Sequence, residues 1–297
     1  MTVALHPASA RQDLAQAVGL AVFAMISIQL AAALSRPLVA EIGASAVTWI
    51  RMAAAAAVLL LVTRPNLRGL SRRAILAALM LGGALAVLSA AYFAAANRLP
   101  LGLVATIAFL GPLTVAVVGA KGWQPIAMAL LAGLGVLLLL WPFSATPGSG
   151  WVADPLGLGL AATSAVALAL YIVLTRRVGI VFKGPDGTTI SIFTAAILLT
   201  PFGLAGLDQM PSLSVVAGSA CLAVLAPLLT CLMELAALRR LGTRCFSILM
   251  SLEPAIAAGL GLVILHEEPS GLQAIGMACV VFALIAALRH ASPAATT

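Results

Sequence analysis

The sequence consists mostly of apolar runs, each about twenty residues long, that follow one another along almost the whole chain. A run of this length can cross the hydrocarbon core of a bilayer as an α-helix. The alternating polarity of a transmembrane β-barrel is absent from the runs. Only 8% of the residues are charged, whereas a soluble domain carries roughly 25%. The sequence therefore predicts an all-α integral membrane protein.

The runs predict ten transmembrane helices. The polar N-terminus followed by the first run also fits a signal peptide, but that run is longer than the apolar part of such a peptide. The predicted spans are 16–34, 44–62, 74–96, 101–119, 125–142, 155–174, 188–205, 213–237, 246–265 and 271–288.

The basic residues predict the orientation of these helices. Thirteen of the 16 Lys and Arg residues fall in segments that would share one side of the membrane with the N-terminus. Only Arg36 and Arg98 fall in the loops of the other side, and Arg51 lies inside a span. Because short cytoplasmic loops are enriched in Lys and Arg, this distribution predicts that both termini are cytoplasmic. The net charge of +7 thus reports orientation and not a nucleic acid partner.

The two halves of the chain resemble each other. Segments 92–116 and 234–258 align at a constant offset of 142 residues, which pairs Pro112 with Pro254. Further along, the segment QPIAMA that begins at residue 124 resembles QAIGMA, which begins at residue 273. The shared order of these matches indicates an internal repeat.

Each copy of the repeat holds five predicted helices. Because five is odd, the second copy must enter the membrane from the opposite side. We therefore predict an inverted repeat, with copies at 16–142 and 155–289 and an outside linker at 143–154. Secondary transporters with this architecture bind their substrate near the midplane, where the repeats meet, and a central cavity is expected there.

Motifs in both halves carry a resemblance to a known family. The chain resembles the drug/metabolite transporter superfamily, in its ten-helix branch of two EamA-type repeats, and within it the inner-membrane threonine/homoserine exporters. The motifs are SIQ (27–29), TWIR (48–51), PLG (100–102), GPLTVA (111–116), Glu234, RRLGTR (239–244), LMSLEPA (249–255), Glu267 and Gln273.

The resemblance implies export of amino acids or related small metabolites across the cell inner membrane, by alternating access and without a cofactor. It also implies a multi-pass protein whose partners are a small-molecule substrate, the lipid bilayer and, for a coupled exporter, protons. Two positions depart from the family pattern, since Leu30 follows SIQ and Ala108 replaces a carboxylate. Both changes predict a more apolar cavity. The oligomeric state is left open.

Three ionisable residues fall inside the predicted spans: Arg51, Glu234 and Glu253. Each costs about 2.5–3.5 kcal/mol on insertion and therefore suggests a function. Glu253 either faces the cavity, where it binds a substrate ammonium or carries a proton, or pairs with Arg51, or is packed in its protonated form. Arg51 either binds a substrate carboxylate or satisfies helix carbonyls. Glu234 either guards the inner mouth or joins a local ion pair.

Polar, aromatic and thioether side chains within the spans complete the candidate cavity, although ordinary packing between helices is the alternative for each. Two prolines within spans are expected to kink their helices. The neutral cavity candidates are Gln29, Tyr92, Thr106, Phe109, Tyr171 and Met250, and the kink candidates are Pro112 and Pro254.

Three alternatives to amino-acid export are an exporter of drugs or toxic cations, an intramembrane enzyme and a non-transporting membrane scaffold. An exporter of drugs or toxic cations needs the buried carboxylate but no working partner arginine. An intramembrane enzyme needs paired catalytic groups at one depth, and the three histidines (His6, His266 and His290) all lie outside the spans. No metal-ligand cluster, nucleophile–base pair or nucleotide-binding loop appears in the sequence. A non-enzymatic transporter is therefore expected.

Overall fold

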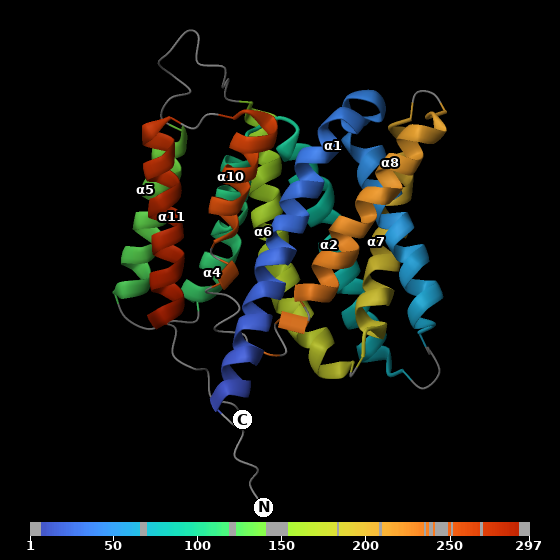
Figure 1. The fold of residues 1–297 in the computed structure, drawn as a ribbon, viewed down its shortest axis with the longest axis horizontal. Coiled ribbons are helices and arrows are strands. Elements are labelled where there is room, and N and C mark those ends of the chain that lie inside the picture. The colour runs from blue at the N-terminus through green and yellow to red at the C-terminus, as the bar shows by residue number, and fades with distance from the viewer. Residues whose placement is uncertain are drawn as a thin grey trace, which may run out of the picture.

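The computed structural model describes residues 7–65, 70–118, 123–140, 154–182, 184–207, 210–234, 236–237, 240, 249–250, 252–267 and 270–290. The regular structure of these residues is helical throughout and forms one elongated bundle (Figure 1). The predicted linker, 143–154, lies outside the described residues except for Asp154. The elements are α1 (Pro7–Thr63), α2 (Arg72–Ala96), α3 (Leu101–Ala108), α4 (Leu110–Val118), α5 (Gln124–Leu140), α6 (Pro155–Val181), α7 (Asp186–Ala205), α8 (Leu213–Ala223), η2 (Val224–Leu229), α10 (Glu253–Leu265) and α11 (Gly271–His290).

The element α1 contains two helical arms that reverse direction at Gly43. This glycine has φ 79° and ψ 157°, a backbone conformation that other residues rarely adopt. The first arm (7–42) rises through the bundle, and the second arm (44–63) returns at its right-hand side in Figure 1. We call the end at which the arms meet the Gly43 end. The opposite end, where α1 begins and α11 ends, is the N-terminal end.

The helices have the length and composition that a bilayer requires. Among the described residues, five helical stretches are long and apolar enough to cross it, namely Ala15–Thr63 of α1, α2, α6, α7 and the stretch Leu213–Glu234. Shorter apolar helices occupy Leu101–Val115, Ile126–Leu138, Glu253–Leu265 and Gly271–Ala283. The predicted class, a helical membrane protein, is confirmed.

Three predicted spans are interrupted where we expected continuous helices, and a proline follows each interruption. The span 101–119 divides into α3 and α4 at Phe109. The span 213–237 contains Ala226 in an extended conformation, with φ −145° and ψ 126°, directly before Pro227. In the span 246–265, α10 begins only at Glu253. A proline lacks the N–H that would bond to the preceding turn, which favours a break upstream of it. Pro227 also disfavours a helical conformation of the residue directly before it, Ala226.

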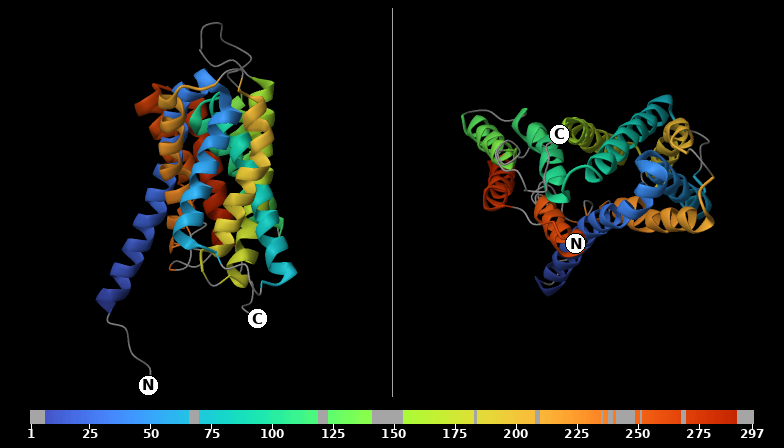
Figure 2. Two further views of the ribbon diagram at one scale, coloured as in Figure 1. Left: turned by 90° about the vertical axis from the view of Figure 1, so that its right-hand side faces the viewer. Right: turned by 90° about the horizontal axis from the view of Figure 1, so that it is seen from above.

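The helices pack mainly in neighbouring pairs. α2 lies against α6 and α7, α5 lies against α11, and α3 lies against α10. α1 contacts α7, α8, η2 and α10. The pair of α5 and α11 forms one end of the elongated outline, as Figure 2 shows from above.

Small residues fill the interior, and large apolar side chains face outward. Many of the buried residues are alanines, whereas Leu61, Val62 and Ile180 are 74–76% exposed. At the crossing of α3 and α10, a Cβ added to Gly102 would lie 2.9 Å from the Cβ of Ala258. Helices in lipid gain little from burying large apolar groups and associate through close packing of small residues. The distribution therefore suits a bundle surrounded by lipid.

Candidate functional site

A buried polar cluster joins three helices in the middle of the bundle. Gln29, on the first arm of α1, donates a hydrogen bond from Nε2 to Oε1 of Glu253 at 2.9 Å. The Tyr92 hydroxyl on α2 donates to Oε1 of Gln29, also at 2.9 Å. All three side chains are buried. The Gln29 amide therefore connects a phenol from one side of the cluster to a carboxylate from the other.

Local structure places Glu253 at the first position of α10. A carboxylate is favoured there, because the first turn of a helix has unpaired N–H groups and the positive end of the dipole. Pro254 follows in the same turn, where its missing N–H costs nothing. Pro112 likewise lies in the first turn of α4. Each proline thus lies in the first turn of a helical segment, and the kink expected at each stays a prediction.

Arg51 lies beside this cluster and makes an unusual contact. Its Cζ is 3.6 Å from the centre of the Phe93 ring, a cation–π arrangement. The Phe93 ring contacts the Tyr92 ring edge to face, with the centroids 5.7 Å apart. The side chain of Arg51 is buried, yet Nε and Nη1 have no hydrogen-bond partner in the part of the chain that the structure describes.

One predicted role of Glu253 was an ion pair with Arg51. The structure contains no such pair, and Glu253 instead accepts the amide hydrogen of Gln29. The position of a residue within a predicted span does not determine which way its side chain points around the helix. Arg51 points to Phe93.

Two further predicted residues, Tyr171 and Glu234, approach each other. The Tyr171 hydroxyl on α6 lies 3.5 Å from Oε2 of Glu234, at the limit of a hydrogen bond. Arg240, a candidate ion-pair partner of Glu234, instead donates to Gln16 at 3.0 Å. Gln16 and Arg240 line an open hollow between α1 and the chain that follows η2. Its other lining residues are Gly19, Leu20, Phe23 and Met233.

The remaining predicted lining residues do not join the polar cluster. Thr106 is buried, and its hydroxyl donates to the carbonyl of Gly102 within the same helix at 2.6 Å. Phe109 and Met250 belong to one apolar cluster with Leu113 on α4 and residues of α5 and α11. Packing thus accounts for the observed positions of these three side chains.

The sequence analysis did not predict the interruption at Ala226 or the side chain of Ser27, which bonds to the backbone there. The carbonyl of Leu225 accepts hydrogen bonds from the hydroxyls of Ser27, at 2.7 Å, and Thr230, at 3.0 Å. Ser27 lies two residues before Gln29. The first arm of α1 therefore bonds to η2 through one face and to the polar cluster through another. The signal that could have predicted the interruption is Pro227, a proline within an apolar run.

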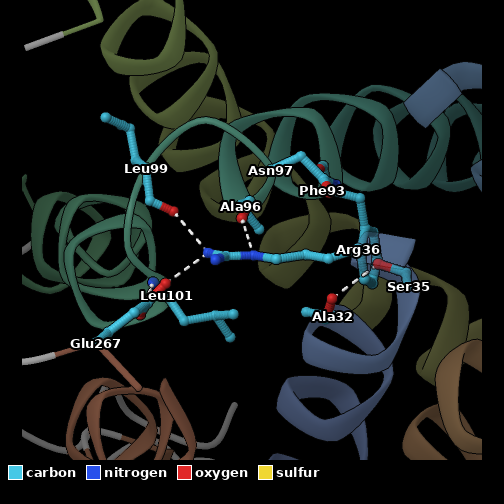
Figure 3. A network of polar contacts seen from close by, with 9 residues as sticks. All are labelled: Ala32, Ser35, Arg36, Phe93, Ala96, Asn97, Leu99, Leu101 and Glu267. Atoms are coloured by element: carbon cyan, nitrogen blue, oxygen red, sulfur yellow. Dashed lines mark hydrogen bonds and ion pairs between the residues drawn. The ribbon is translucent and has the colours of Figure 1, made fainter. Parts of the chain in front are cut away.

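A second polar network closes around Arg36 and Glu267 at the Gly43 end (Figure 3). The guanidinium Nη2 lies 2.6 Å from Oε1 of Glu267, and it also donates to the Leu99 carbonyl at 3.2 Å. The Nε atom donates to the Ala96 carbonyl at 3.1 Å. The second carboxylate oxygen of Glu267 accepts from the backbone N–H of Leu101 at 2.9 Å. Both charged residues had been noted in the sequence, but not as partners.

Comparison with known proteins identifies the family. The model of the EamA-like transporter family matches residues 155–289. The threonine/homoserine exporter RhtA of Salmonella typhimurium is 31% identical over 262 residues, which cover 88% of this chain and 87% of that protein. The chain belongs to the EamA-like transporter family. The Escherichia coli K12 exporter of the same name is 30% identical over 261 residues, again 88% of this chain and 87% of that protein.

Two further proteins are similar to this chain. Protein PecM of Dickeya dadantii is 30% identical over 207 residues, 65% of this chain and 66% of that protein. One solved crystal structure superposes with a TM-score of 0.55 at 20% identity, covering 96% of this chain and 98% of that one. That likeness shows a shared fold. The resemblance predicted from the sequence motifs is confirmed, and this EamA-like protein is a multi-pass membrane protein.

Proposed function

We propose that this EamA-like protein exports amino acids or related small metabolites from the cytoplasm by alternating access. The observation that carries the proposal is the buried cluster of Gln29, Tyr92 and Glu253, with Arg51 beside it. A carboxylate and a cation with unpaired donors are expensive inside a membrane protein and are expected where a polar solute passes. The relatives named as threonine/homoserine exporters support this class of substrate.

The proposed architecture is an inverted pair of five-helix repeats, 16–142 and 155–289. Under that pseudo-twofold relation, the packing of α2 on α6 corresponds to the packing of α8 and η2 on α1, and both contacts occur. The pairs α3 with α10 and α5 with α11 would each consist of equivalent helices, and each pair packs together. The range of the family match, 155–289, equals the second proposed repeat. These contacts support a bundle whose two halves can rock about a shared centre.

The proposed orientation places the N-terminal end of the bundle in the cytoplasm of the inner membrane. α1 begins and α11 ends at this end (Figure 1), where the arginines at the start of α2 also lie. Arg36 and Arg98 lie at the other end. The positive-inside rule favours this orientation.

The cluster supports recognition of a zwitterion. Glu253 offers a carboxylate for an ammonium group, and Arg51 offers unpaired N–H donors for a carboxylate. An α-amino acid carries both groups on a single carbon atom, Cα. The neighbouring side chain of Phe93 and the buried Ala108 give an apolar surrounding, which favours a larger or more apolar side chain than that of threonine.

Export of drugs or toxic cations is the second candidate, and the buried Glu253 favours it. The two candidates differ in what they require of Arg51. Replacement of Arg51 by Met should abolish transport of a zwitterion, because its carboxylate loses its partner. Cation efflux should survive, since a buried positive charge only repels the cargo.

The test is transport by the purified protein in liposomes. Radiolabelled amino acids are offered as a panel, and unlabelled amino acids and lipophilic cations compete. We expect saturable flux of a subset of amino acids and a loss of about tenfold or more in Glu253→Gln, because a charge-assisted hydrogen bond is removed. Glu41→Gln, which alters an exposed carboxylate on the first arm of α1, is the matched control. Absence of flux across the panel would overturn the proposal.

A further inference from the structure

We infer that Arg36 and Glu267 form the latch of an outer gate, which holds the Gly43 end of the bundle shut while the other end opens. This inference rests on the proposed function, since a gate serves a protein that carries solutes. It extends that function to residues remote from the central cluster. The latch differs from the substrate-binding groups because its charges contact each other and backbone carbonyls, not a passing solute.

The geometry of the latch ties the two proposed repeats together at one point. Arg36 comes from the first arm of α1. Its guanidinium reaches the carbonyl of Ala96, the last residue of α2, and that of Leu99 in the turn before α3. Glu267 comes from the end of α10 in the other repeat. One of its oxygens accepts a hydrogen bond from Arg36. The other accepts from the backbone N–H of Leu101, the first residue of α3. Figure 3 shows the Arg36 side chain extended across the gap between these elements.

Beneath the latch, apolar residues from the same elements close the path toward the polar cluster. Ala33, one helical turn from Arg36, packs in a single cluster with Leu99, Leu101 and Tyr92. Ile264 and Leu265, at the end of α10, pack against this cluster. The ion pair therefore lies above an apolar layer formed by both repeats. This arrangement blocks a polar solute at the Gly43 end.

The backbone at the end of α10 is shaped so that Glu267 turns back toward the bundle. His266 adopts a left-handed conformation with φ 55° and ψ 35°, and the Glu267 N–H bonds to the Gly261 carbonyl at 3.0 Å. A left-handed residue at this position is a common way for a helix to end. Gly261 makes room for the carboxylate, because an added Cβ would lie 2.5 Å from Oε2 of Glu267.

The exposure of the pair suits a contact that must open. The side chains of Arg36 and Glu267 are 29% and 12% exposed, so water can hydrate both charges when they separate. A fully buried pair would pay a far larger desolvation cost on each cycle. A more exposed ion pair would contribute little to keeping the end closed. This is expected of Arg98 and Asp154 at the same end, whose side chains are 47% and 27% exposed.

The experiment measures access to the apolar layer from outside. A single cysteine, Ala33→Cys, is introduced after the native cysteines are replaced, and right-side-out vesicles are treated with a membrane-impermeant maleimide. We expect slow labelling with the native latch and roughly tenfold faster labelling in Glu267→Gln and Arg36→Gln, since charge-assisted hydrogen bonds are lost. Arg98→Gln, in the exposed ion pair, is the matched control and should label at the native rate.

A second pair of variants tests the latch without touching either charge. Gly261→Ala places a Cβ against the Glu267 carboxylate and should also accelerate labelling of Ala33→Cys. Gly259→Ala, on the same helix, meets no atom within 4 Å and should not. Labelling that is equally slow in all variants, or equally fast in variants and controls, would overturn the gate.

The readout separates the gate from the proposed function. If the protein carries no amino acid but the latch variants still label faster, the closure at the Gly43 end stands and the substrate assignment fails. If transport is present and labelling is indifferent to the latch, the gate fails alone. A double variant, Arg36→Cys with Glu267→Cys, bridged by a bifunctional thiosulfonate, should stop transport until a reductant is added. Unchanged transport after bridging would also overturn the gate.

Discussion

Gln29 and Glu253 meet at 2.9 Å across 224 residues of chain, and the Tyr92 hydroxyl bonds to the other end of the same amide. An amide in this position satisfies a donor and an acceptor at once, with its nitrogen toward the carboxylate and its oxygen toward the phenol. A leucine of similar size would leave both partners unpaired in the interior. Gln29 is therefore the residue on which the geometry of the cluster depends most.

We predict that Gln29→Leu impairs both stability and transport. The loss should be about 1–3 kcal/mol for each buried partner left unpaired, and transport should fall at least as much as in Glu253→Gln. Tyr92→Phe, which removes only one donor, should cost about 1 kcal/mol and retain part of the flux. Thermal unfolding in detergent and initial transport rates measure the two effects. Equal stability of Gln29→Leu and the wild type would contradict this view of the cluster.

Arg51 should behave differently from Gln29. Because two of its donors lack a partner and the charge is buried, replacing it with Met should leave stability unchanged or raise it. Amino-acid transport should nevertheless be lost. Arg51→Lys keeps the charge but loses the planar guanidinium, whose donors can bind both oxygens of a carboxylate. This variant should transport weakly. A large fall in melting temperature for Arg51→Met would show instead that the arginine is structural.

The interruption at Ala226 depends on two hydroxyls. Ser27→Ala and Thr230→Val each remove one donor from the Leu225 carbonyl, and each should cost about 0.5–1.5 kcal/mol. The double variant should cost more than the sum, because the carbonyl is then left without a partner. A double-mutant cycle on thermal stability measures this coupling. Strict additivity would show that water replaces the lost hydroxyls.

Close approach of α3 and α10 should make Gly102 intolerant of substitution. Gly102→Ala forces a Cβ against Ala258 and should destabilise the protein by about 1–3 kcal/mol. Gly133→Ala on α5 is the matched control, because an added Cβ there meets nothing within 4 Å. That change should be neutral or slightly stabilising through helix propensity. The check is unfolding of both variants by heat in the same detergent.

The exposed pair of Arg98 and Asp154 should give a small acid dependence. The hydrogen bond from Arg98 lowers the pKa of the Asp154 carboxyl. Because the folded pKa lies below the unfolded value, the stabilisation is present above about pH 4 and is lost as the pH falls through the folded pKa. Asp154→Asn keeps a cap for α6 but loses the charge. Its deficit in melting temperature at pH 7 should shrink on acidification, and a constant deficit would contradict the assignment.

The sequence predicted the class and the approximate helices because hydropathy reports directly which residues can face lipid. It did not predict where helices end. The first arm of α1 runs to residue 42, well beyond the apolar run that ends near 34, since helix geometry continues until Gly43 allows a positive φ. The interruption before Pro227 was also missed, although a proline within an apolar run is a usable signal.

For the polar groups, the sequence located the members but not their partners. Glu253 and Gln29 were both candidates, but the sequence did not predict that they bond to each other, and Arg51 was the one pairing suggested for Glu253. Arg36 and Glu267 were placed in loops on one side of the membrane without a pairing. Partner choice depends on rotation about helix axes and on tilt, which are set by packing. Apolar runs that carry almost no amphipathic pattern do not record these quantities.

The alanine-rich interior has a mechanical consequence. Leucine and isoleucine on facing helices interlock as knobs and ridges, and shifting such helices requires many side chains to change rotamer. Alanine has no rotamers, and surfaces of alanine and glycine are nearly smooth. Helices that meet through such surfaces can slide by small steps while keeping contact. Few side chains in the interior of this bundle therefore oppose the sliding of one helix along another. The polar contacts between helices limit how far they slide.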